Sequence, residues 1–277
     1  MKKILFPTDF SEVADNAFIH ALEFAKIVNG EILLLHTFAL PVVENPFTPD
    51  NYYTIYDSMQ LAQFDVFKGQ IPKLHELAEK QHLENIPLNH KIMEGDLIYS
   101  IEKTIEEENI DFVVMGTSGV TGWEAFFIGS NTGSVVTAVD VPVLSVPAEA
   151  EFTTIKTIGF TTRFRDKDKP ALRQVLKIAS KANAEVKCLY VKTHKSDVTD
   201  ETISQWRNEF QNDPVDFLIL NSDLVKETIL DFISNKSIDI LAMITHKRNF
   251  FSELFQPSLT QKFSNISTVP ILAMHEE

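Results

Sequence analysis

The chain has 277 residues, of which 44% are hydrophobic and 23% charged. This is ordinary for a soluble globular protein of about two domains. Its longest apolar runs are only as long as strands, whereas a membrane-spanning helix needs ~18 or more apolar residues. No apolar signal core follows the first residues, so we expect a cytoplasmic protein without a membrane partner. The single cysteine, Cys188, rules out an internal disulfide and is expected to be buried.

The formal net charge of -14 resides in the first half of the chain. Residues 1–150 hold 8 Lys and Arg against 22 Asp and Glu, whereas residues 151–277 hold 17 of each. An acidic surface repels the phosphates of DNA and RNA, so we expect no nucleic-acid partner. An acidic domain can still bind a nucleotide, but only through local donors or a metal ion.

In the first part of the chain, short apolar runs alternate with segments of helical spacing. The pattern predicts strands at 3–6, 31–38, 90–93, 112–115 and 141–146, and helices at about 14–25, 71–80, 97–108 and 129–139. Asp9 to Ser11 supply N-cap residues for the first helix. Continuous apolar strands between helices indicate a parallel sheet that is covered on both faces.

The same pattern occurs a second time. Residues 17–38 align without gaps to residues 171–192. The similarity is higher between residues 110–115 and residues 238–243. At that second offset the Val-Pro at 141–142 meets the Val-Pro at 269–270. Matched segments in the same order predict a tandem duplication, with domains at 1–148 and 153–277 joined by a linker near 147–154.

The first copy carries an insertion at residues 39–70. This segment is rich in proline and aromatic residues and lies between a strand and a helix. It reads as a surface loop, or alternatively as a lid over a site, because loops at the carboxyl ends of strands line ligand crevices in such folds.

A glycine-rich segment follows the fourth predicted strand of the first copy. Gly116 and Gly119 come directly after the strand, and Gly129 and Ser130 open the next helix. Backbone N–H groups and the positive end of a helix dipole meet an anion at such a place. The segment contains no lysine and is neither a Walker A loop nor a G-x-G-x-x-G motif. Taken alone, it could equally be an ordinary turn and helix cap.

The spacing G-x2-G-x9-G-[ST] resembles the ATP-binding motif of the universal stress protein family. The opening ILFPTDFSE at 4–12 and the strand VPVLSV at 141–146 are similar to the first and last strands of that family. The resemblance implies two tandem Rossmann-like α/β domains of the adenine nucleotide alpha hydrolase type. Each would hold a five-stranded parallel sheet with helices on both faces.

The resemblance also implies an ATP site in the first copy, with Mg²⁺ accompanying the nucleotide. Asp9 and Thr37 would lie at the adenine, and Pro7 and Thr8 would line the pocket. Asp9 could also serve only as a helix cap. The remaining residues would contact ribose and phosphates: Met115, Gly116, Ser118, Gly119, Gly129, Ser130 and Asn131.

The second copy departs from this motif. In the repeat alignment Ile244, Lys247 and Pro257 replace the three glycines, Arg163 replaces Asp9, and Ser258 keeps the type of Ser130. Nucleotide binding in the family manner is therefore not expected there. The positive charge of Arg163, Arg165, Lys247 and Arg248 could bind another anion, pair with the acidic first domain, or form a solvated rim.

No catalytic constellation or metal site is recognisable in the sequence, and His36 is expected to be a satisfied core histidine rather than a catalytic group. We therefore expect an ATP-binding regulatory or stress-response module rather than a fast enzyme. The alternatives are a slow ATPase or phosphotransferase, and an interaction module that needs no nucleotide.

The last strands of the two copies, at 141–146 and 269–274, are expected to pair with each other. A bare apolar edge strand is an aggregation liability, and a tandem chain can cover it internally. This predicts an internal pseudo-dimer of the two domains. A homodimer of chains is also possible.

Overall fold

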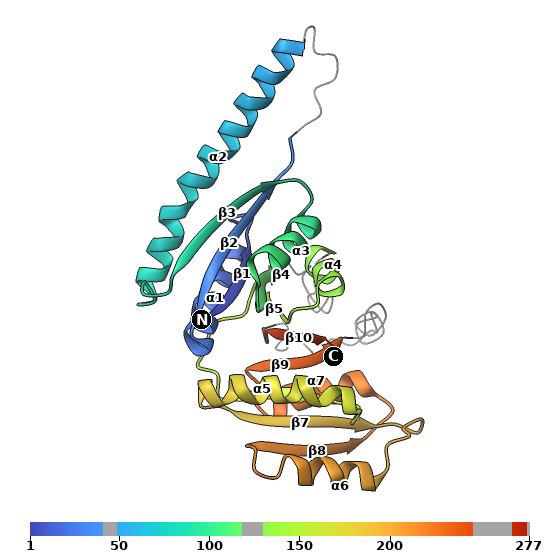
Figure 1. The fold of residues 1–277 in the computed structure, drawn as a ribbon. Coiled ribbons are helices and arrows are strands. Elements are labelled where there is room, and N and C mark those ends of the chain that lie inside the picture. The colour runs from blue at the N-terminus through green and yellow to red at the C-terminus, as the bar shows by residue number, and fades with distance from the viewer. Residues whose placement is uncertain (41–48, 118–129, 246–267, 276–277) are drawn as a thin grey trace. The chain divides into compact units, whose positions relative to one another are not determined.

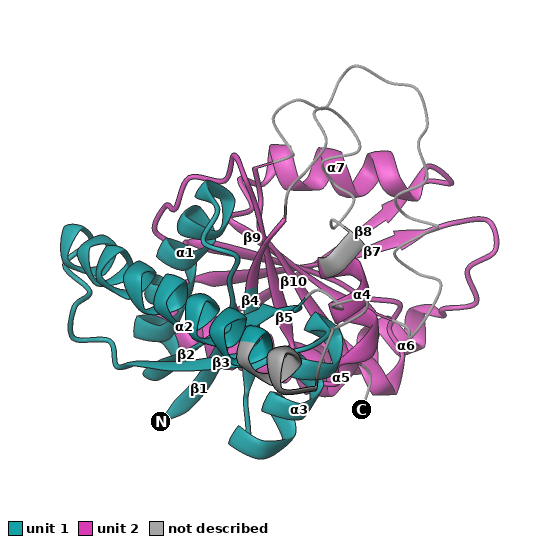
Figure 2. Cartoon of the chain, turned by 90° about the horizontal axis from the view of Figure 1, so that it is seen from above, with its two compact units in different colours: residues 1–114 teal, residues 115–277 magenta. Residues whose placement is uncertain are grey.

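The computed structural model of the protein describes residues 1–40, 49–117, 130–245 and 268–275 (Figure 1). The chain divides into two compact units, Met1–Val114 and Met115–Glu277 (Figure 2). The boundary between the units falls inside strand β4, not at the predicted linker. The predicted domain limits of 1–148 and 153–277 remain a prediction.

The first unit is a parallel sheet with helices, in strand order β3-β2-β1-β4. Strands β1, β2 and β4 are formed largely from buried apolar residues, as expected for a parallel sheet covered on both faces. Its elements are β1 (Lys2–Pro7), α1 (Glu12–Val28), β2 (Gly30–Phe38), α2 (Pro49–Lys80), β3 (Leu88–Glu94), α3 (Leu97–Glu108) and β4 (Phe112–Thr117), the last of which runs on into the second unit.

Helix α1 shows how the sequence sets the ends of an element. The Ser11 hydroxyl accepts a hydrogen bond from the Ala14 N–H and caps the first turn, as predicted. Asn29 ends the helix in the left-handed conformation with φ 58°, which asparagine tolerates better than most residues. Between these caps the helix buries an apolar face that includes Phe18 and Leu22.

The prediction of a loop at residues 39–70 was wrong for residues 49–70, whereas the alternative of a lid over a site stays a prediction. These residues form the first part of α2, which continues to Lys80 (Figure 1). The predicted helix at 71–80 buries Leu74 and Ala78, whereas Leu61 and Phe64 farther up the helix are 65% and 49% exposed. Because the apolar residues of this part do not form a buried stripe, helical periodicity could not reveal it.

The second unit holds the end of the first copy and the whole of the second. Its strand order is β5-β10-β9-β6-β7-β8, and every pair of adjacent strands from β10 to β8 is parallel. Its elements are α4 (Ser130–Ala138), β5 (Val143–Pro147), β6 (Thr157–Thr161), the 3-10 turn η2 (Asp166–Asp168), α5 (Lys169–Ala182), β7 (Glu185–Lys192), α6 (Asp200–Glu209), β8 (Val215–Asn221), α7 (Val225–Asn235), β9 (Ile240–Thr245) and β10 (Ile271–His275).

Strands β5 and β10 pair with each other in antiparallel orientation, as their apolar edges led us to expect. The pairs in register are Val143 with Ala273, Leu144 with Leu272 and Ser145 with Ile271. Both strands are largely buried, so neither presents an open edge to solvent at these residues.

The predicted fold class is confirmed: an α/β fold with a mostly parallel sheet flanked by helices. Within the described ranges, no helix is long and apolar enough to cross a membrane. Cys188 is buried in β7, and the pKa of its thiol is raised well above its usual value by burial and by the nearby charge of Asp168.

Candidate functional site

The turn after β1 is built around Thr8. Its N–H donates to Leu35 O (2.9 Å), and its hydroxyl accepts from the N–H of Phe10 (3.0 Å), which lies in the left-handed region with φ 61°. His36 Nδ1 is 2.8 Å from Thr8 O, so the ring of His36 also holds this turn. His36 thus has a hydrogen-bonding partner, as predicted, but it is half-buried rather than a core side chain.

Four of the predicted site residues lie together at the carboxyl ends of β1 and β2 in the first unit. Pro7 pairs with Leu35, and Thr37 follows two residues later on β2. Thr8 is buried, while the carboxylate of Asp9 is exposed and accepts a hydrogen bond from the Ser11 N–H (3.0 Å). Asp9 therefore does take part in a turn before α1, and its exposure leaves room for another donor.

The other predicted residues belong to the second unit. Met115 is buried near the end of β4, and Gly116 O accepts a hydrogen bond from the Thr132 hydroxyl in the first turn of α4 (3.3 Å). This bond places the start of α4, at Ser130 and Asn131, against the carboxyl end of β4. Ser118, Gly119 and Gly129 lie outside the described residues.

The turn after β6 in the second copy repeats the backbone of the β1 turn. Thr162 N–H donates to Leu189 O (3.0 Å), and the Thr162 hydroxyl accepts from Phe164 N–H (2.8 Å), with Phe164 at φ 55°. At the position of Asp9, however, stands the exposed side chain of Arg163.

A buried carboxylate, Asp168, holds this second turn. Its Oδ2 accepts from the Thr162 hydroxyl (2.9 Å) and from the N–H groups of Arg163 (2.9 Å) and Arg165 (3.3 Å). Asp168 is 2% exposed. Sequence reasoning missed it, although the repeat alignment places it opposite the apolar Ala14.

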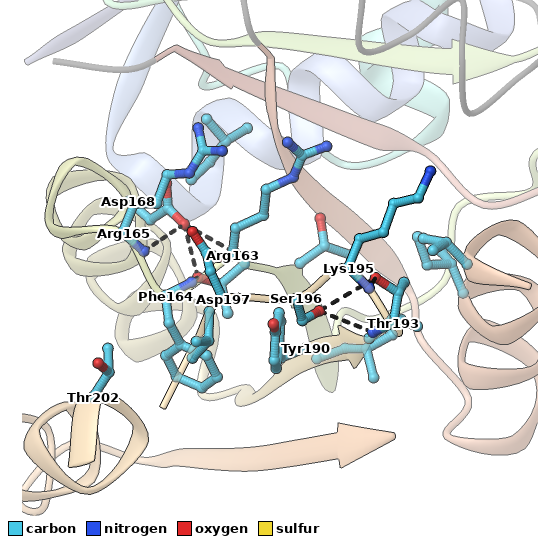
Figure 3. A pocket seen from close by; sticks show the side chains of 18 residues that line it. Arg163, Phe164, Arg165, Asp168, Tyr190, Thr193, Lys195, Ser196, Asp197 and Thr202 are labelled. Carbon is cyan, nitrogen blue, oxygen red and sulfur yellow. Dashed lines mark hydrogen bonds between the residues drawn. The ribbon is translucent and has the colours of Figure 1, made fainter. Parts of the chain in front are cut away.

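A cavity of about 570 Å³ opens at the carboxyl ends of β6, β7 and β9, entirely within the second unit (Figure 3). The loops after β6 and β7 supply its charged residues, and α7 supplies Val225 and Ile229. Arg163 and Arg165, which the sequence singled out, line it, whereas Lys247 and Arg248 lie outside the described residues. Lys195 also lines the cavity and was not predicted.

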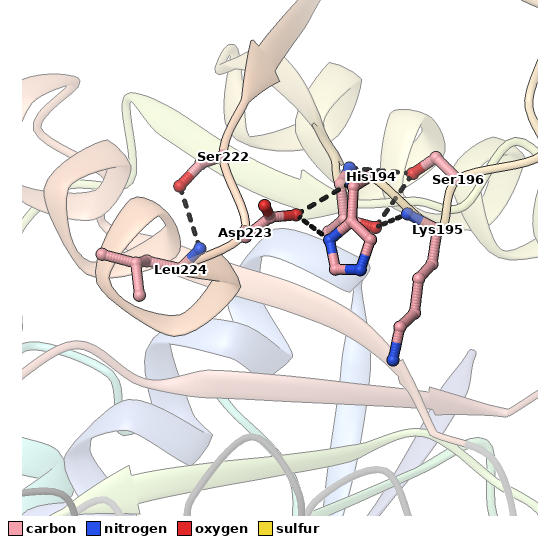
Figure 4. A network of polar contacts seen from close by, with 7 residues as sticks. His194, Lys195, Ser196, Ser222, Asp223 and Leu224 are labelled. Atoms are coloured by element: carbon pink, nitrogen blue, oxygen red, sulfur yellow. Dashed lines mark hydrogen bonds and ion pairs between the residues drawn. The ribbon is translucent and has the colours of Figure 1, made fainter.

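The loop after β7 is fixed by a network of polar contacts (Figure 4). Asp223 Oδ1 accepts from the His194 N–H (2.8 Å) and lies 2.7 Å from His194 Nδ1. Both bonds lower the pKa of Asp223, and the backbone bond has the larger effect. Ser196 Oγ accepts from the Thr193 N–H (2.9 Å), so the segment that carries Lys195 is held from both sides.

Among the residues that the structure describes, no group of three or more His, Cys, Asp or Glu could hold a metal ion. The polar groups at the β1 and β4 ends are hydroxyls, backbone groups and one exposed carboxylate, which suit hydrogen bonding to a polar ligand rather than tight metal ligation.

The fold defines an α/β protein with a mostly parallel sheet, and comparison with known proteins names its family. The family model described as universal stress protein family matches residues 1–147, so the chain belongs to the universal stress protein family.

The chain resembles two universal stress proteins of Methanocaldococcus jannaschii. It is 31% identical to MJ0577 over 156 residues, which is 52% of this chain and 94% of that protein. It is 29% identical to MJ0531 over 146 residues, covering 52% of this chain and 81% of that protein.

The crystal structure of a universal stress protein from Archaeoglobus fulgidus resembles the whole chain. It matches 99% of this chain and 96% of its own with a TM-score of 0.72, at 18% identity. At that identity the likeness concerns the fold, and it extends through both copies.

Proposed function

We propose that the protein is a cytoplasmic regulatory module of the stress response that binds ATP in its first copy. The observation that carries the proposal is the bond from Thr132 to Gly116 O, which sets the first turn of α4 against the end of β4. The amide groups at a helix start are the natural partners of a phosphate. Family membership and the G-x2-G-x9-G-[ST] spacing support the same assignment.

In this proposal each group of residues has a distinct task. Asp9 accepts a hydrogen bond from the exocyclic amine of adenine, and Pro7, Thr8 and Thr37 line the base pocket. Met115 lies beside the ribose. Backbone and hydroxyl donors hold the phosphates, and Mg²⁺ neutralises part of their charge: Gly116, Ser118, Gly119, Gly129, Ser130 and Asn131.

Titration of the full chain with Mg-ATP by calorimetry tests this proposal. We expect one nucleotide per chain, and a stabilisation of about 2.7 kcal/mol at 100-fold excess over Kd. Gly119→Val should abolish binding because a side chain keeps the backbone away from phosphate. Gly69→Val is the matched control, since a Cβ at Gly69 meets nothing within 4 Å. Two equivalent sites, or normal binding by Gly119→Val, would contradict the proposal.

We further propose that the two copies form an internal pseudo-dimer through β5 and β10. The register supports a disulfide between cysteines at Ser145 and Ile271, which lie directly opposite each other. Cysteines at Ser145 and Ala273 are offset by two residues, which puts their Cβ atoms roughly 7–8 Å apart and too far for a bond. Rapid cross-linking within one chain is expected for the first pair alone, and cross-linking between chains would point to a homodimer instead.

A further inference from the structure

The cavity of the second copy combines a positive rim with an apolar wall. Arg163 and Lys195 extend their charged ends toward the same side from neighbouring loops (Figure 3), and Arg165 adds a third cation to the lining. The lining also has an aliphatic wall, made of Leu189, Val191, Val225, Ile229 and Ile244.

The carboxylates of the lining leave the rim positive. Asp168 accepts hydrogen bonds from three donors of its own loop. Its carboxylate therefore stabilises the turn that carries Arg163 and Arg165. Asp197 is exposed. Three cations against two carboxylates give the lining a formal charge of +1, and Oδ2 of the one buried carboxylate already accepts three hydrogen bonds.

The cavity does not suit the phosphates of a nucleotide. Ile244 stands where the first copy has Gly116, and its buried side chain lines the cavity. A chain of phosphates needs bare backbone at that strand end, whereas an isoleucine offers a methyl-rich surface to an apolar group.

We propose that this cavity binds a small organic acid, with its carboxylate at Arg163 and Lys195 and its apolar body against the aliphatic wall. Its volume of about 570 Å³ falls within the roughly 300–1,000 Å³ of small-molecule sites. Charge-assisted hydrogen bonds fix the head, and burial of the tail supplies the remaining affinity. The inference concerns the second copy and does not depend on ATP binding by the first.

Octanoate is the probe, titrated into the full chain by calorimetry beside octanol and octylamine, which share its tail. We expect one octanoate per chain and at least about tenfold weaker binding of both other compounds, since each lacks the anionic head. Equal binding of octanol, or no binding of octanoate, would overturn the proposal.

Two variants locate the site. Arg163→Ala with Lys195→Ala should weaken octanoate binding at least about tenfold, because the carboxylate loses both of its charged partners. Both side chains are exposed, so their loss should leave the fold intact. Lys177→Ala, an exposed cation on α5 outside the cavity, is the matched control and should bind normally. Val225→Phe should block the tail. Octanoate binding that survives both changes, or displacement of octanoate by ATP in the Gly119→Val chain, would refute the assignment.

Discussion

The turns after β1 and β6 share a backbone but differ in their charges. In each, a buried threonine accepts from the N–H two residues ahead, and a phenylalanine takes the left-handed conformation. The residue between them is Asp9 in the first copy and Arg163 in the second. The first turn is capped locally by Asp9 and Ser11, whereas the second depends on Asp168 from the following 3-10 turn.

The two copies have kept the same turn backbone and differ in the side chains that the turn exposes. Aromatic packing supports both turns in the same way: Phe10 lies 5.0 Å from the ring of His36, and Phe164 lies 5.2 Å from that of Tyr190. What changed is the sign of the exposed charge and the residue at the end of the fourth strand. Packing constrains the first kind of position, whereas the second kind is where we propose that the two copies bind different ligands.

The largest expected effect comes from exchanging the residue at the end of that strand. Gly116→Ile should weaken ATP binding by at least about 100-fold, since a branched side chain denies the phosphates several charge-assisted hydrogen bonds. The reciprocal Ile244→Gly should not create a second ATP site, because Lys247 and Pro257 still replace glycines. Calorimetric stoichiometry checks both variants, and two ATP molecules per Ile244→Gly chain would show that the copies differ by one side chain only.

The next effect concerns the buried carboxylate that distinguishes the second turn. Asp168→Ala removes the acceptor of two backbone N–H groups and one hydroxyl, so unfolding of the second copy should become easier by about 3 kcal/mol. Denaturation followed by the fluorescence of Trp206, whose buried ring lies 5.1 Å from Phe164, reports on this region.

Asp166→Ala is the matched control for Asp168→Ala. Asp166 is 93% exposed and pairs with Lys169 at 2.8 Å, so its loss should cost no more than about 0.5 kcal/mol. Equal losses for the two variants would mean that the second turn does not depend on its buried acid.

The sequence was sufficient to predict most of the fold because its signals are local. Asn29 and Asn183 both end helices in the left-handed conformation, and each lies just before a buried apolar strand. Pairing of β5 with β10 followed from the need to cover two apolar edges. The first half of α2 escaped prediction because burial, which gives a helix its periodic pattern, is missing around Leu61 and Phe64.

The site was harder to predict than the fold. The glycine spacing and Arg163 could be found by aligning the copies. Asp168 could not, because its role depends on three donors that only the folded turn brings together. Lys195 could not be predicted either, because it joins the cavity lining only when the loop after β7 lies beside the loop after β6.

A smaller effect tests a feature that both copies share. The Thr117 hydroxyl donates to Val146 O (3.4 Å), and the Thr245 hydroxyl donates to Met274 O (3.2 Å). Both threonines are buried, so Thr117→Val and Thr245→Val should each cost about 1 kcal/mol in the free energy of unfolding. Chemical denaturation of the full chain measures this. A loss confined to one variant would mean that only one of the two threonine–carbonyl bonds contributes to stability.

The smallest effect is a response to acid in the first copy. The rings of His75 and His90 lie 6.2 Å apart. Desolvation, and then the positive charge of His75, lower the pKa of His90 from its usual 6.5. The folded state therefore binds fewer protons than the unfolded state once the pH falls below 6.5. The first copy loses stability from there down to the pKa of folded His90, and below that pKa the loss no longer grows.

His75→Gln removes the second of these causes and leaves the first. The pKa of His90 should rise part of the way toward 6.5, and the loss of stability in acid should shrink with it. A titration of the His90 ring by NMR measures the shift, with His194→Gln in the other unit as the control. If the His90 pKa does not move in His75→Gln, desolvation alone lowers it. The acid response would then belong to a single side chain of β3.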